Sequence, residues 1–512
     1  MAPEVGGIPG LLRARATGSA GRAALVHDDA SITYAELGAR TRDLAGAFAG
    51  AGLTKSSRVG VLMPNGIDWA VVAYAVSRTG ATLVPLSTLL RPPELEAQLR
   101  QASVTHLVAV PRYRNRFHLD EIAEVRPRVP SLRVVWTADD LPSDPAPRGI
   151  AEALEERVTA ADDLAILFTS GSRGVPKGVI HTHGNAIRAA ASGLDARCIG
   201  PGERIYIPMP FFWTGGFASG LITALVAGAT LLIESESTPA ETIAFLERER
   251  ATLFRGWPDQ AARIAADPAF SSADLSSLGP GSLPAIQPPE QRPTPGTRAN
   301  TFGMTETFGP YCGSRLDTDL PPSARGSCGK PFDGVEVRIL DDNGHERGPG
   351  EQGEIAVRGP NVMRGIVGRL RSEIFTRDGY YRTGDLGHLD ADGYLFYAGR
   401  VDDMFKVSGA TVYPSEVEAA LHASPLVARA FVTNVSDNGA DTVGAAVVPS
   451  GDATVDDLYA DARERLSAFK VPKRWAVLAS VDDVPRLATG KVDKTGLQAL
   501  LTSAPRPTGA TP

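Results

Sequence analysis

The strongest local signal in the sequence is the stretch Leu167–Asn185, LFTSGSRGVPKGVIHTHGN. It begins with apolar residues that predict a buried strand, and the strand leads into a loop of three hydroxyl residues, three glycines and Lys177. Exposed backbone N–H groups beside an ammonium are what binding several phosphate oxygens requires, whereas a plain surface turn needs neither the lysine nor the strand. The Walker spacing GxxxxGK[ST] would place glycine at position 176, where this chain has Pro176. The stretch therefore predicts a phosphate-binding loop that is not of the Walker type.

Strand and helix patterns alternate on both sides of this loop. Before it, apolar strands are predicted at 57–63, 81–86 and 105–110, with helical spacing over 68–77 and 93–101. After it, another apolar strand is predicted at 229–233. Continuous apolar strands separated by helices indicate an α/β fold with parallel, doubly wound sheets.

The pattern changes twice toward the C-terminus. From about Ser327, short strands punctuated by glycine (VEVRIL, GEIAVRG, GYLFYAGR) predict a β-rich subdomain. After Arg400, about 110 residues of mixed helix and strand predict a small α+β domain. We therefore expect a large N-terminal domain over 1–399, a small C-terminal domain, and a disordered tail over 503–512.

Composition excludes several classes of protein. The 512 residues are 43% apolar and 22% charged, which is typical of a folded globular chain. The longest apolar run, Leu221–Ile233, is interrupted by polar residues and is too short to span a membrane, and no signal peptide is evident. A net charge of −7 gives no indication of a nucleic-acid partner. Three cysteines that lie far apart predict neither disulfides nor a zinc site. Since neither a membrane span nor a signal peptide is indicated, the cytoplasm is the expected location.

The loop TSGSRGVPKG resembles the phosphate-binding loop of the adenylate-forming (AMP-binding) superfamily, which includes acyl-CoA synthetases, peptide-synthetase adenylation domains and luciferases. Four further segments resemble motifs of that superfamily in the same order, so the resemblance covers nearly the whole chain. They are TFGMTE at 301–306, YRTGD at 381–385, GRVDDMFKVSGATVYPSEVE at 399–418, and PRLATGK at 485–491. Only eight of the 52 basic residues are lysines, and three of the eight fall on these motifs: Lys177, Lys406 and Lys491.

The resemblance implies which residues hold ATP. In TFGMTE, Phe302 offers a flat face to adenine and Gly303 allows close backbone approach. Thr305 and Glu306 supply a hydroxyl and a hard carboxylate for a phosphate and its Mg²⁺, so Glu306 is both the expected metal ligand and a catalytic residue. The resemblance also implies that the loop binds the phosphates, through Thr169, Ser170, Gly171, Ser172 and Lys177.

Asp385 and Arg400 are implied to hold the ribose. By themselves they would fit a solvated turn and a surface ion pair, and only the ordered set of motifs favours the binding role. Lys491 resembles the superfamily's catalytic lysine, which bridges the attacking carboxylate and the α-phosphate as pyrophosphate leaves.

The small domain is implied to serve two steps. Asp402 occupies the hinge position, so 400–403 is the expected hinge and 404–502 a mobile lid. Lys491 would close over ATP and the acid in the first step. In the second step, the loop carrying Lys406 and Gly409 would replace it and open a channel for a thiol. Lys470 and Lys473 form a basic cluster that fits the phosphates of coenzyme A, or equally a generic basic surface.

Three departures from the superfamily pattern concern the acyl-binding wall. Trp213 stands where many members have histidine, Arg173 replaces a threonine or serine of the loop, and 276–300 is unusually rich in proline. The candidate pocket walls, each of which could equally be plain core, are Trp213, Phe217, Trp257, Phe308 and Tyr311. His181 and His183 are interpreted as structural, because a carboxylate substrate is already ionised and needs no base.

These observations predict a carboxylic acid:CoA ligase. ATP with Mg²⁺ would activate a small carboxylic acid to an acyl-adenylate, and coenzyme A would then take the acyl group and release AMP. Two alternatives stay open: an adenylating enzyme whose acceptor is a carrier-protein thiol or a nitrogen nucleophile, and a non-catalytic nucleotide-binding regulator. The second is disfavoured by the presence of Lys491, Glu306 and Asp385 together. We expect a monomer or homodimer, with neither nucleic acid nor an integral membrane association.

Overall fold

The computed structural model describes residues 6–144, 149–169, 176–401, 405–407, 410–437, 440–466, 470–487 and 490–508. The chain divides into two compact units. The first comprises 1–337, 357–381 and 393–395, and the second comprises 338–356, 382–392 and 396–512. This division assigns part of the region before residue 399 to the second unit, whereas the sequence placed the boundary at 399.

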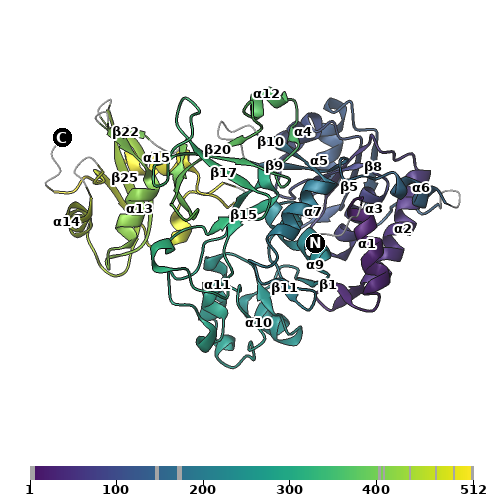
Figure 1. Cartoon of the computed structure of the whole chain (residues 1–512), viewed down its shortest axis with the longest axis horizontal. Helices are drawn as coiled ribbons and strands as arrows, with labels where there is room; N and C mark the ends of the chain where they lie inside the picture. The colour runs from purple at the N-terminus through teal and green to yellow at the C-terminus, as the bar shows by residue number, and fades with distance from the viewer. Residues whose placement is uncertain are drawn as a thin grey trace. The chain divides into compact units, whose positions relative to one another are not determined.

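The first unit contains a seven-stranded sheet in which the predicted parallel arrangement is confirmed (Figure 1). Its order is β19-β10-β9-β4-β3-β5-β8. The strands β8, β5, β3, β4 and β9 pair in parallel, while β10 and β19 add antiparallel strands at one edge. Their bounds are β3 (Arg58–Leu62), β4 (Thr82–Pro85), β5 (His106–Ala109), β8 (Val134–Thr137), β9 (Asp163–Thr169), β10 (Lys177–Thr182) and β19 (Gly365–Ile366).

A second sheet of the same unit has five strands in the order β13-β11-β12-β1-β2. Four of them are parallel and β2 pairs antiparallel to β1, so this sheet is also of the wound type. The bounds are β1 (Ala23–His27), β2 (Ala30–Thr33), β11 (Arg204–Tyr206), β12 (Thr230–Ile233) and β13 (Leu253–Phe254).

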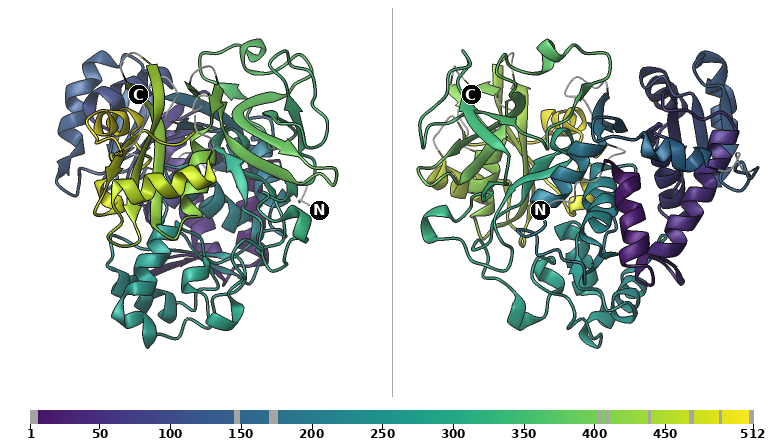
Figure 2. Two further views of the ribbon diagram at one scale, coloured as in Figure 1. Left: turned by 90° about the vertical axis from the view of Figure 1, so that its left-hand side faces the viewer. Right: turned by 45° about the vertical axis from the view of Figure 1, so that its right-hand side comes forward.

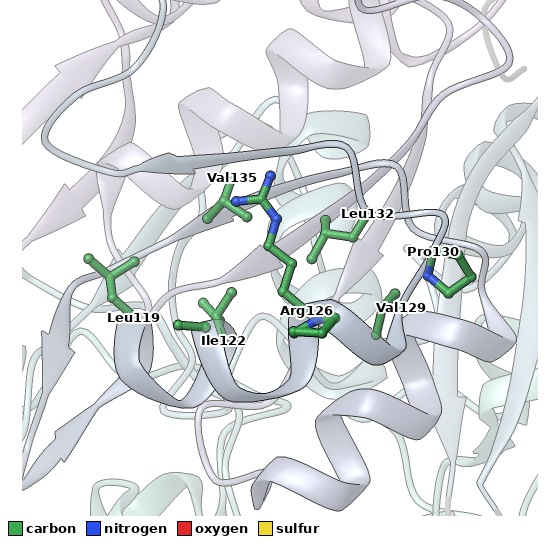
Figure 3. A pocket seen from close by; sticks show the side chains of 9 residues that line it. Leu119, Ile122, Arg126, Val129, Pro130, Leu132 and Val135 are labelled. Atoms are coloured by element: carbon green, nitrogen blue, oxygen red, sulfur yellow. The ribbon is translucent and has the colours of Figure 1, made fainter.

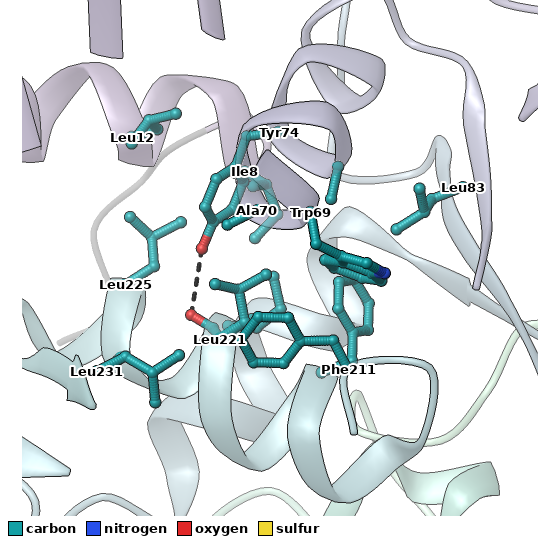
Figure 4. Close-up of a cluster of buried hydrophobic side chains, with 14 of the residues drawn as sticks. Ile8, Leu12, Trp69, Ala70, Tyr74, Leu83, Phe211, Leu221, Leu225 and Leu231 are labelled. Carbon is teal, nitrogen blue, oxygen red and sulfur yellow. Dashed lines mark hydrogen bonds between the residues drawn. The ribbon is translucent and has the colours of Figure 1, made fainter. Parts of the chain in front are cut away.

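Helices α1 (Ile8–Gly18), α2 (Tyr34–Gly50) and α3 (Ile67–Arg78) pack side by side (Figure 2). The third is apolar on almost every side, which is typical of a helix buried all round. Trp69 from this helix packs on Phe211 with ring centroids 5.1 Å apart, and the hydroxyl of Tyr74 donates a 3.2 Å hydrogen bond to the carbonyl of Leu221 (Figure 4). No helix within the described residues is long and apolar enough to span a membrane.

The remaining helices of the first unit connect these strands. A capping box between Thr182 and Asn185 starts α7 directly after β10, and a second between Thr238 and Glu241 starts α10. The bounds are α4 (Pro92–Gln101), α5 (His118–Val125), α6 (Ile150–Glu156), α7 (His183–Ser192), α8 (Thr214–Gly216), α9 (Thr223–Ala227), α10 (Pro239–Arg248), α11 (Pro258–Ala266) and α12 (Arg371–Ile374).

Short strands follow, as the glycine-punctuated pattern predicted. One sheet runs β14 (Phe302–Met304), β15 (Gly309–Gly313), β16 (Lys330–Pro331). Another has the order β17 (Glu336–Leu340), β18 (Gly353–Arg358), β20 (Tyr381–Leu389), β21 (Leu395–Arg400). The β-rich region is therefore confirmed.

The C-terminal region is α+β, as predicted. A hairpin and a three-stranded sheet surround the fully buried Trp475, and three helices pack on them. The bounds are β22 (Phe405–Val407), β23 (Ala410–Val412), α13 (Pro414–His422), β24 (Val427–Asp437), β25 (Ala440–Pro449), α14 (Val455–Arg465), β26 (Arg474–Val477) and α15 (Lys494–Thr502).

The chain after α15 differs from the expected disordered tail. The carbonyl of Pro505 accepts a 3.2 Å hydrogen bond from the amide of Trp475, and the carbonyl of Ala504 accepts a 2.9 Å bond from the Arg474 side chain. Ala504 is buried in an apolar cluster with Leu497 and Leu501 of α15. Residues 503–508 thus pack on the domain, because a buried methyl and two carbonyls anchor them.

Candidate active site

The predicted phosphate-binding loop connects two antiparallel strands of the seven-stranded sheet, β9 and β10. Thr169 at the end of β9 lies opposite Lys177 at the start of β10. The Thr169 hydroxyl is buried and has no hydrogen-bond partner among the described residues, so it is available to a ligand. The predicted loop residues Ser170, Gly171 and Ser172 lie outside the described residues.

The fold brings Lys177 to the carboxylate of Glu306. Their Nζ and Oε1 atoms are 2.6 Å apart, and Glu306 is only 4% exposed. The hydroxyl of Tyr381 donates to the same carboxylate at 3.2 Å and lies 3.5 Å from the Lys177 ammonium. Two residues predicted separately therefore form one charged centre. Sequence reasoning gave no role to Tyr381, although it begins the YRTGD motif.

Thr305 is held from two sides. Its hydroxyl lies 2.9 Å from that of Thr214, and its carbonyl accepts a 2.8 Å hydrogen bond from Nε2 of His181. The other ring nitrogen of His181 accepts from the Asn185 amide at 3.0 Å, so the imidazole is fixed as the Nε2–H tautomer. Burial lowers the pKa of His181 to about 4, and the ring is neutral at pH 7. His181 thus holds backbone of the TFGMTE segment.

His183 has a similar environment at the start of α7. Its Nδ1 accepts a 3.2 Å hydrogen bond from the amide of Ile8, and burial lowers its pKa to about 4. Both histidines bond to backbone groups, in keeping with the structural role expected for them.

Phe302 and Gly303 form the strand that precedes Thr305. A Cβ at position 303 would lie 2.3 Å from the carbonyl oxygen of Gly309 and 2.4 Å from Cα of Pro310. The close approach that requires this glycine is therefore made by the neighbouring strand β15. Phe302 is half-buried, and its ring centroid lies 5.6 Å from that of Tyr311.

The predicted acyl-pocket residues divide into two groups. Phe217 and Phe308 are buried in the core and pack against each other, with ring centroids 5.9 Å apart. Trp213 is half-buried and Trp257 is 42% exposed, and their rings meet edge to face at 6.1 Å. The two tryptophans thus present apolar surface that a ligand could cover.

Phe308 has an unusual backbone conformation next to the TFGMTE segment. Its φ of 55° lies in the left-handed region that non-glycine residues rarely adopt. The ring packs edge to face on His181 with centroids 4.8 Å apart. Packing of the buried Phe308 ring offsets the local backbone strain. The same packing brings the ring into contact with His181, the histidine that holds Thr305.

In the second unit, the predicted ribose-binding residues lie together. Arg400 donates to the Asp385 carboxylate at 2.8 Å and to the carbonyl of Thr383 at 3.2 Å. The Thr383 hydroxyl accepts from the amide of Asp385 at 3.0 Å and donates to a neighbouring strand carbonyl at 2.8 Å. The Thr-Gly-Asp turn therefore holds a carboxylate that is 6% exposed.

The predicted lid residues are only partly described. Asp402, Gly409 and the Lys406 side chain lie outside the described residues; the backbone of Lys406 pairs with position 411 across the β22–β23 hairpin. Lys491 is exposed, and its carbonyl accepts a 2.8 Å hydrogen bond from the amide of Leu487. Its side chain is thus on the surface of the unit.

The expected coenzyme A contacts lie near α13. Lys470 forms an ion pair with Glu416 of that helix, and the backbone of Lys473 hydrogen-bonds to Val443 at 2.8 Å. The charge of Lys470 is therefore already paired, and a phosphate would have to compete with Glu416 for this ammonium group.

No group of three or more histidine, cysteine or acidic side chains that could hold a metal occurs among the described residues. The chemistry at Glu306 fits Mg²⁺ nonetheless, because this ion takes one or two carboxylates and completes its shell with water and phosphate oxygens.

An apolar pocket of about 620 Å³ lies beside α5, lined by Leu119, Ile122, Val129, Leu132 and Val135 (Figure 3). None of the predicted site residues lines it. The chemistry of the chain therefore does not centre on this pocket.

Comparison with known proteins agrees with this geometry. The family model of AMP-binding enzymes matches residues 12–367, and the model of the AMP-binding enzyme C-terminal domain matches residues 416–491. A feruloyl-CoA synthase from Amycolatopsis sp is 33% identical over 486 residues, with 92% of this chain and 94% of that protein covered. An indoleacetate–CoA ligase from Aromatoleum aromaticum is 32% identical over 504 residues, with 94% and 95% covered.

Solved structures give the same fold. The anthranilate CoA ligase AuaEII, in complex with anthranoyl-AMP, has a TM-score of 0.80 at 24% identity and covers 98% of each chain. The o-succinylbenzoate CoA synthetase MenE of Bacillus subtilis, in complex with ATP and magnesium, has a TM-score of 0.79 at 26% identity, covering 96% of this chain and 99% of that one. This chain therefore belongs to the AMP-binding enzyme family and is an adenylate-forming enzyme of the acyl-CoA synthetase type.

Proposed function

We propose that the acid which this acyl-CoA synthetase activates carries an aromatic ring or a comparably bulky apolar group. The reaction has two halves. ATP and the carboxylate give an acyl-adenylate and pyrophosphate, and coenzyme A then takes the acyl group and releases AMP.

The observation that carries this proposal is the position of Trp213. The hydroxyl of the next residue, Thr214, is hydrogen-bonded to the hydroxyl of Thr305. The TFGMTE motif implies that Thr305 binds a phosphate. Trp213 is therefore adjacent in sequence to a residue that contacts the segment which the family resemblance assigns to the phosphates. Its indole and that of Trp257 meet edge to face and present apolar surface that the described residues cover only in part. A ring between or against them would bury that surface in a geometry that aromatic groups prefer.

The relatives support the same class of acid. The feruloyl-CoA synthase and the indoleacetate–CoA ligase are named for acids with aromatic rings. Acetate has no group that could cover two indoles. One methylene of fit is worth about 1–3 kcal/mol, so a whole ring contributes strongly to discrimination.

The Lys177–Glu306 pair prepares the site for Mg·ATP. Glu306 is the carboxylate that would hold Mg²⁺, and when bound that ion neutralises charge on the phosphates. Lys177 then exchanges its carboxylate partner for phosphate oxygens, while the Tyr381 hydroxyl keeps a hydrogen bond to Glu306. This exchange conserves the charge balance around a buried carboxylate, which would be costly to leave unpaired.

The roles of the other predicted residues follow from the family resemblance. Asp385 and Arg400 bind the ribose hydroxyls. The side chain of Lys491 is exposed. It stabilises negative charge between the acid and the α-phosphate. The domain assignment, with a hinge at 400–403 and a lid over 404–502, belongs to the same proposal.

Coenzyme A is the acceptor that the relatives' names support, in preference to a carrier-protein thiol or an amine. Lys470 and Lys473 would contact its phosphates. Because Glu416 already pairs with Lys470, we expect Glu416→Gln to lower the KM for coenzyme A, whereas a structural role for the pair predicts no change.

The proposal is tested by pyrophosphate release over a panel of acids, with and without coenzyme A. Ferulate, indoleacetate and benzoate should exceed acetate in kcat/KM by at least about ten-fold, and thioester should form only with coenzyme A present. A preference for acetate would contradict the assigned acid class. Adenylate formation that leads to no thioester would contradict the acceptor.

A further inference from the structure

Four arginines border one open pocket of about 590 Å³ in the first unit. Arg358 is paired with Glu336 and Arg364 with Asp163, the latter at 2.7 Å. The other two, Arg188 of α7 and Arg371 of α12, are exposed and have no carboxylate partner among the described residues. No aspartate or glutamate is among the pocket's lining residues within the part of the chain that the structure describes. The pocket therefore carries an excess of positive charge.

Besides the arginines, the lining contains two polar side chains, Thr182 and Asn185, and several apolar ones. Val362, Met363 and Phe375 form part of the wall, and the Arg371 guanidinium lies 4.3 Å from the centroid of the Phe375 ring. A guanidinium group binds phosphate through two parallel N–H donors, and the edge of an aromatic ring beside it adds apolar surface for an organic group. A pocket with two unpaired guanidinium groups and an apolar wall fits a ligand with a doubly charged anion on an organic body.

The pocket is distinct from the nucleotide site. Thr182, at the far end of β10, lines it, whereas Lys177 at the other end of this strand does not. The two residues are five residue steps apart along the strand, a distance of about 17 Å. Neither Thr305 nor Glu306 lines the pocket.

Hydrogen bonds nevertheless connect the pocket wall to the catalytic segment. The amide of Met363 donates to the carbonyl of Glu306 at 2.7 Å. Asn185, also in the wall, donates to His181, which in turn donates to the carbonyl of Thr305. The same Asn185 amide reaches the carbonyl of Asn361 at 3.2 Å. One pocket residue, Met363, therefore holds the carbonyl of Glu306 directly, and another, Asn185, is connected to the carbonyl of Thr305 through His181.

We propose that this arginine pocket is a second ligand site, which binds a small phosphate ester and alters the enzyme's use of Mg·ATP through Met363 and Asn185. The phosphate lies between Arg188 and Arg371, and the organic group lies against Phe375. Binding shifts the wall and, with it, the backbone of Thr305 and Glu306.

The test uses phenyl phosphate as the probe. It is titrated by calorimetry into the full-length enzyme saturated with AMP, so that the nucleotide site is occupied. We expect saturable binding of one molecule per chain. Arg188→Gln and Arg371→Gln should each weaken it by about ten-fold, the effect of losing one charge-assisted contact. Arg263→Gln, an exposed arginine of α11 away from the pocket, is the matched control and should change affinity less than two-fold.

Binding that does not saturate, or that Arg188→Gln and Arg371→Gln leave unchanged, would overturn the site. The coupling is tested separately: phenyl phosphate should change the KM for Mg·ATP at least two-fold in the wild type and not in Arg188→Gln. An unchanged KM in the wild type would overturn the coupling. Because calorimetry needs no turnover, its result does not depend on which acid the enzyme activates.

Discussion

Glu306 is a nearly buried carboxylate whose charge is balanced by the Lys177 ammonium and which accepts a hydrogen bond from the Tyr381 hydroxyl. Removing a single partner of such a pair leaves the other charge without compensation, whereas removing both does not. Stability and catalysis should therefore respond differently to single and double substitutions at Lys177 and Glu306.

We predict that Lys177→Met lowers the free energy of unfolding by roughly 1–3 kcal/mol, a range that allows for the partial exposure of the lysine. The double variant Lys177→Met/Glu306→Gln should recover most of that loss while losing adenylation activity by about 10²-fold or more. Urea denaturation and pyrophosphate release give the two quantities. A double variant less stable than Lys177→Met would contradict the charge-balance argument.

We propose that Trp213 contributes to the choice of acid. Trp213→Ala should reduce kcat/KM for ring-bearing acids relative to bulkier ones by roughly 10–200-fold, with little change in the KM for ATP. The measurement is kcat/KM over a graded acid series, with Phe217→Leu as a core control. An unchanged ranking in Trp213→Ala would place this side chain outside the pocket.

At the scale of elements, the junction of β10 and α7 buries two neutral histidines, His181 and His183. The pKa of each is lowered to about 4 by burial, whereas an unfolded histidine titrates near its ordinary value of 6.5. Between these values the unfolded chain takes up protons that the folded chain does not, so stability falls as the pH falls.

We therefore predict that each of these histidines removes roughly 2 kcal/mol of stability between pH 7 and pH 5. His181→Gln, which keeps a donor for the Thr305 carbonyl, should reduce the loss of stability between pH 7 and pH 5 by roughly 2 kcal/mol. His345→Gln, at an exposed position, should leave it unchanged. Denaturant unfolding at the two pH values measures this, and equal pH dependence in wild type and His181→Gln would refute the buried neutral state.

Elements were predictable where the local pattern is complete. The apolar runs at 57–63, 81–86 and 105–110 correspond to the parallel strands β3, β4 and β5, because strands buried on both faces need continuous apolar sequence. The antiparallel direction of β10 was not predicted, since direction depends on pairing between segments. The packing of residues 503–508 was also missed, because a polar, proline-rich sequence carries no periodic signal.

The site shows the same limit. Lys177, Glu306, Asp385 and Arg400 were identified from motifs, but the 2.6 Å contact between the first two depends on the fold. The roles of Tyr381 and His181 come from single hydrogen bonds that no spacing reveals. Likewise, Trp213 is half-buried whereas Phe217 is fully buried. The residue type alone does not determine this difference in exposure.

At the scale of the whole molecule, the two half-reactions are proposed to need two positions of the C-terminal domain. If Asp402 is the hinge, Asp402→Pro fixes φ and blocks the change between them. Adenylate should then form at near the wild-type rate while thioester yield falls by about ten-fold or more. Separate assays of pyrophosphate and thioester check this, and equal loss in both would reject the hinge assignment.

We propose that this enzyme forms an adenylate from a ring-bearing acid and that Lys491 stabilises the reaction. Acid-dependent exchange of labelled pyrophosphate into ATP, measured without coenzyme A, tests it most directly. We predict exchange with ferulate or indoleacetate, little with acetate, and a loss of about 10²–10³-fold in Lys491→Ala, with Lys494→Ala as the neighbouring control. Exchange that is independent of added acid, or undiminished in Lys491→Ala, would contradict the account.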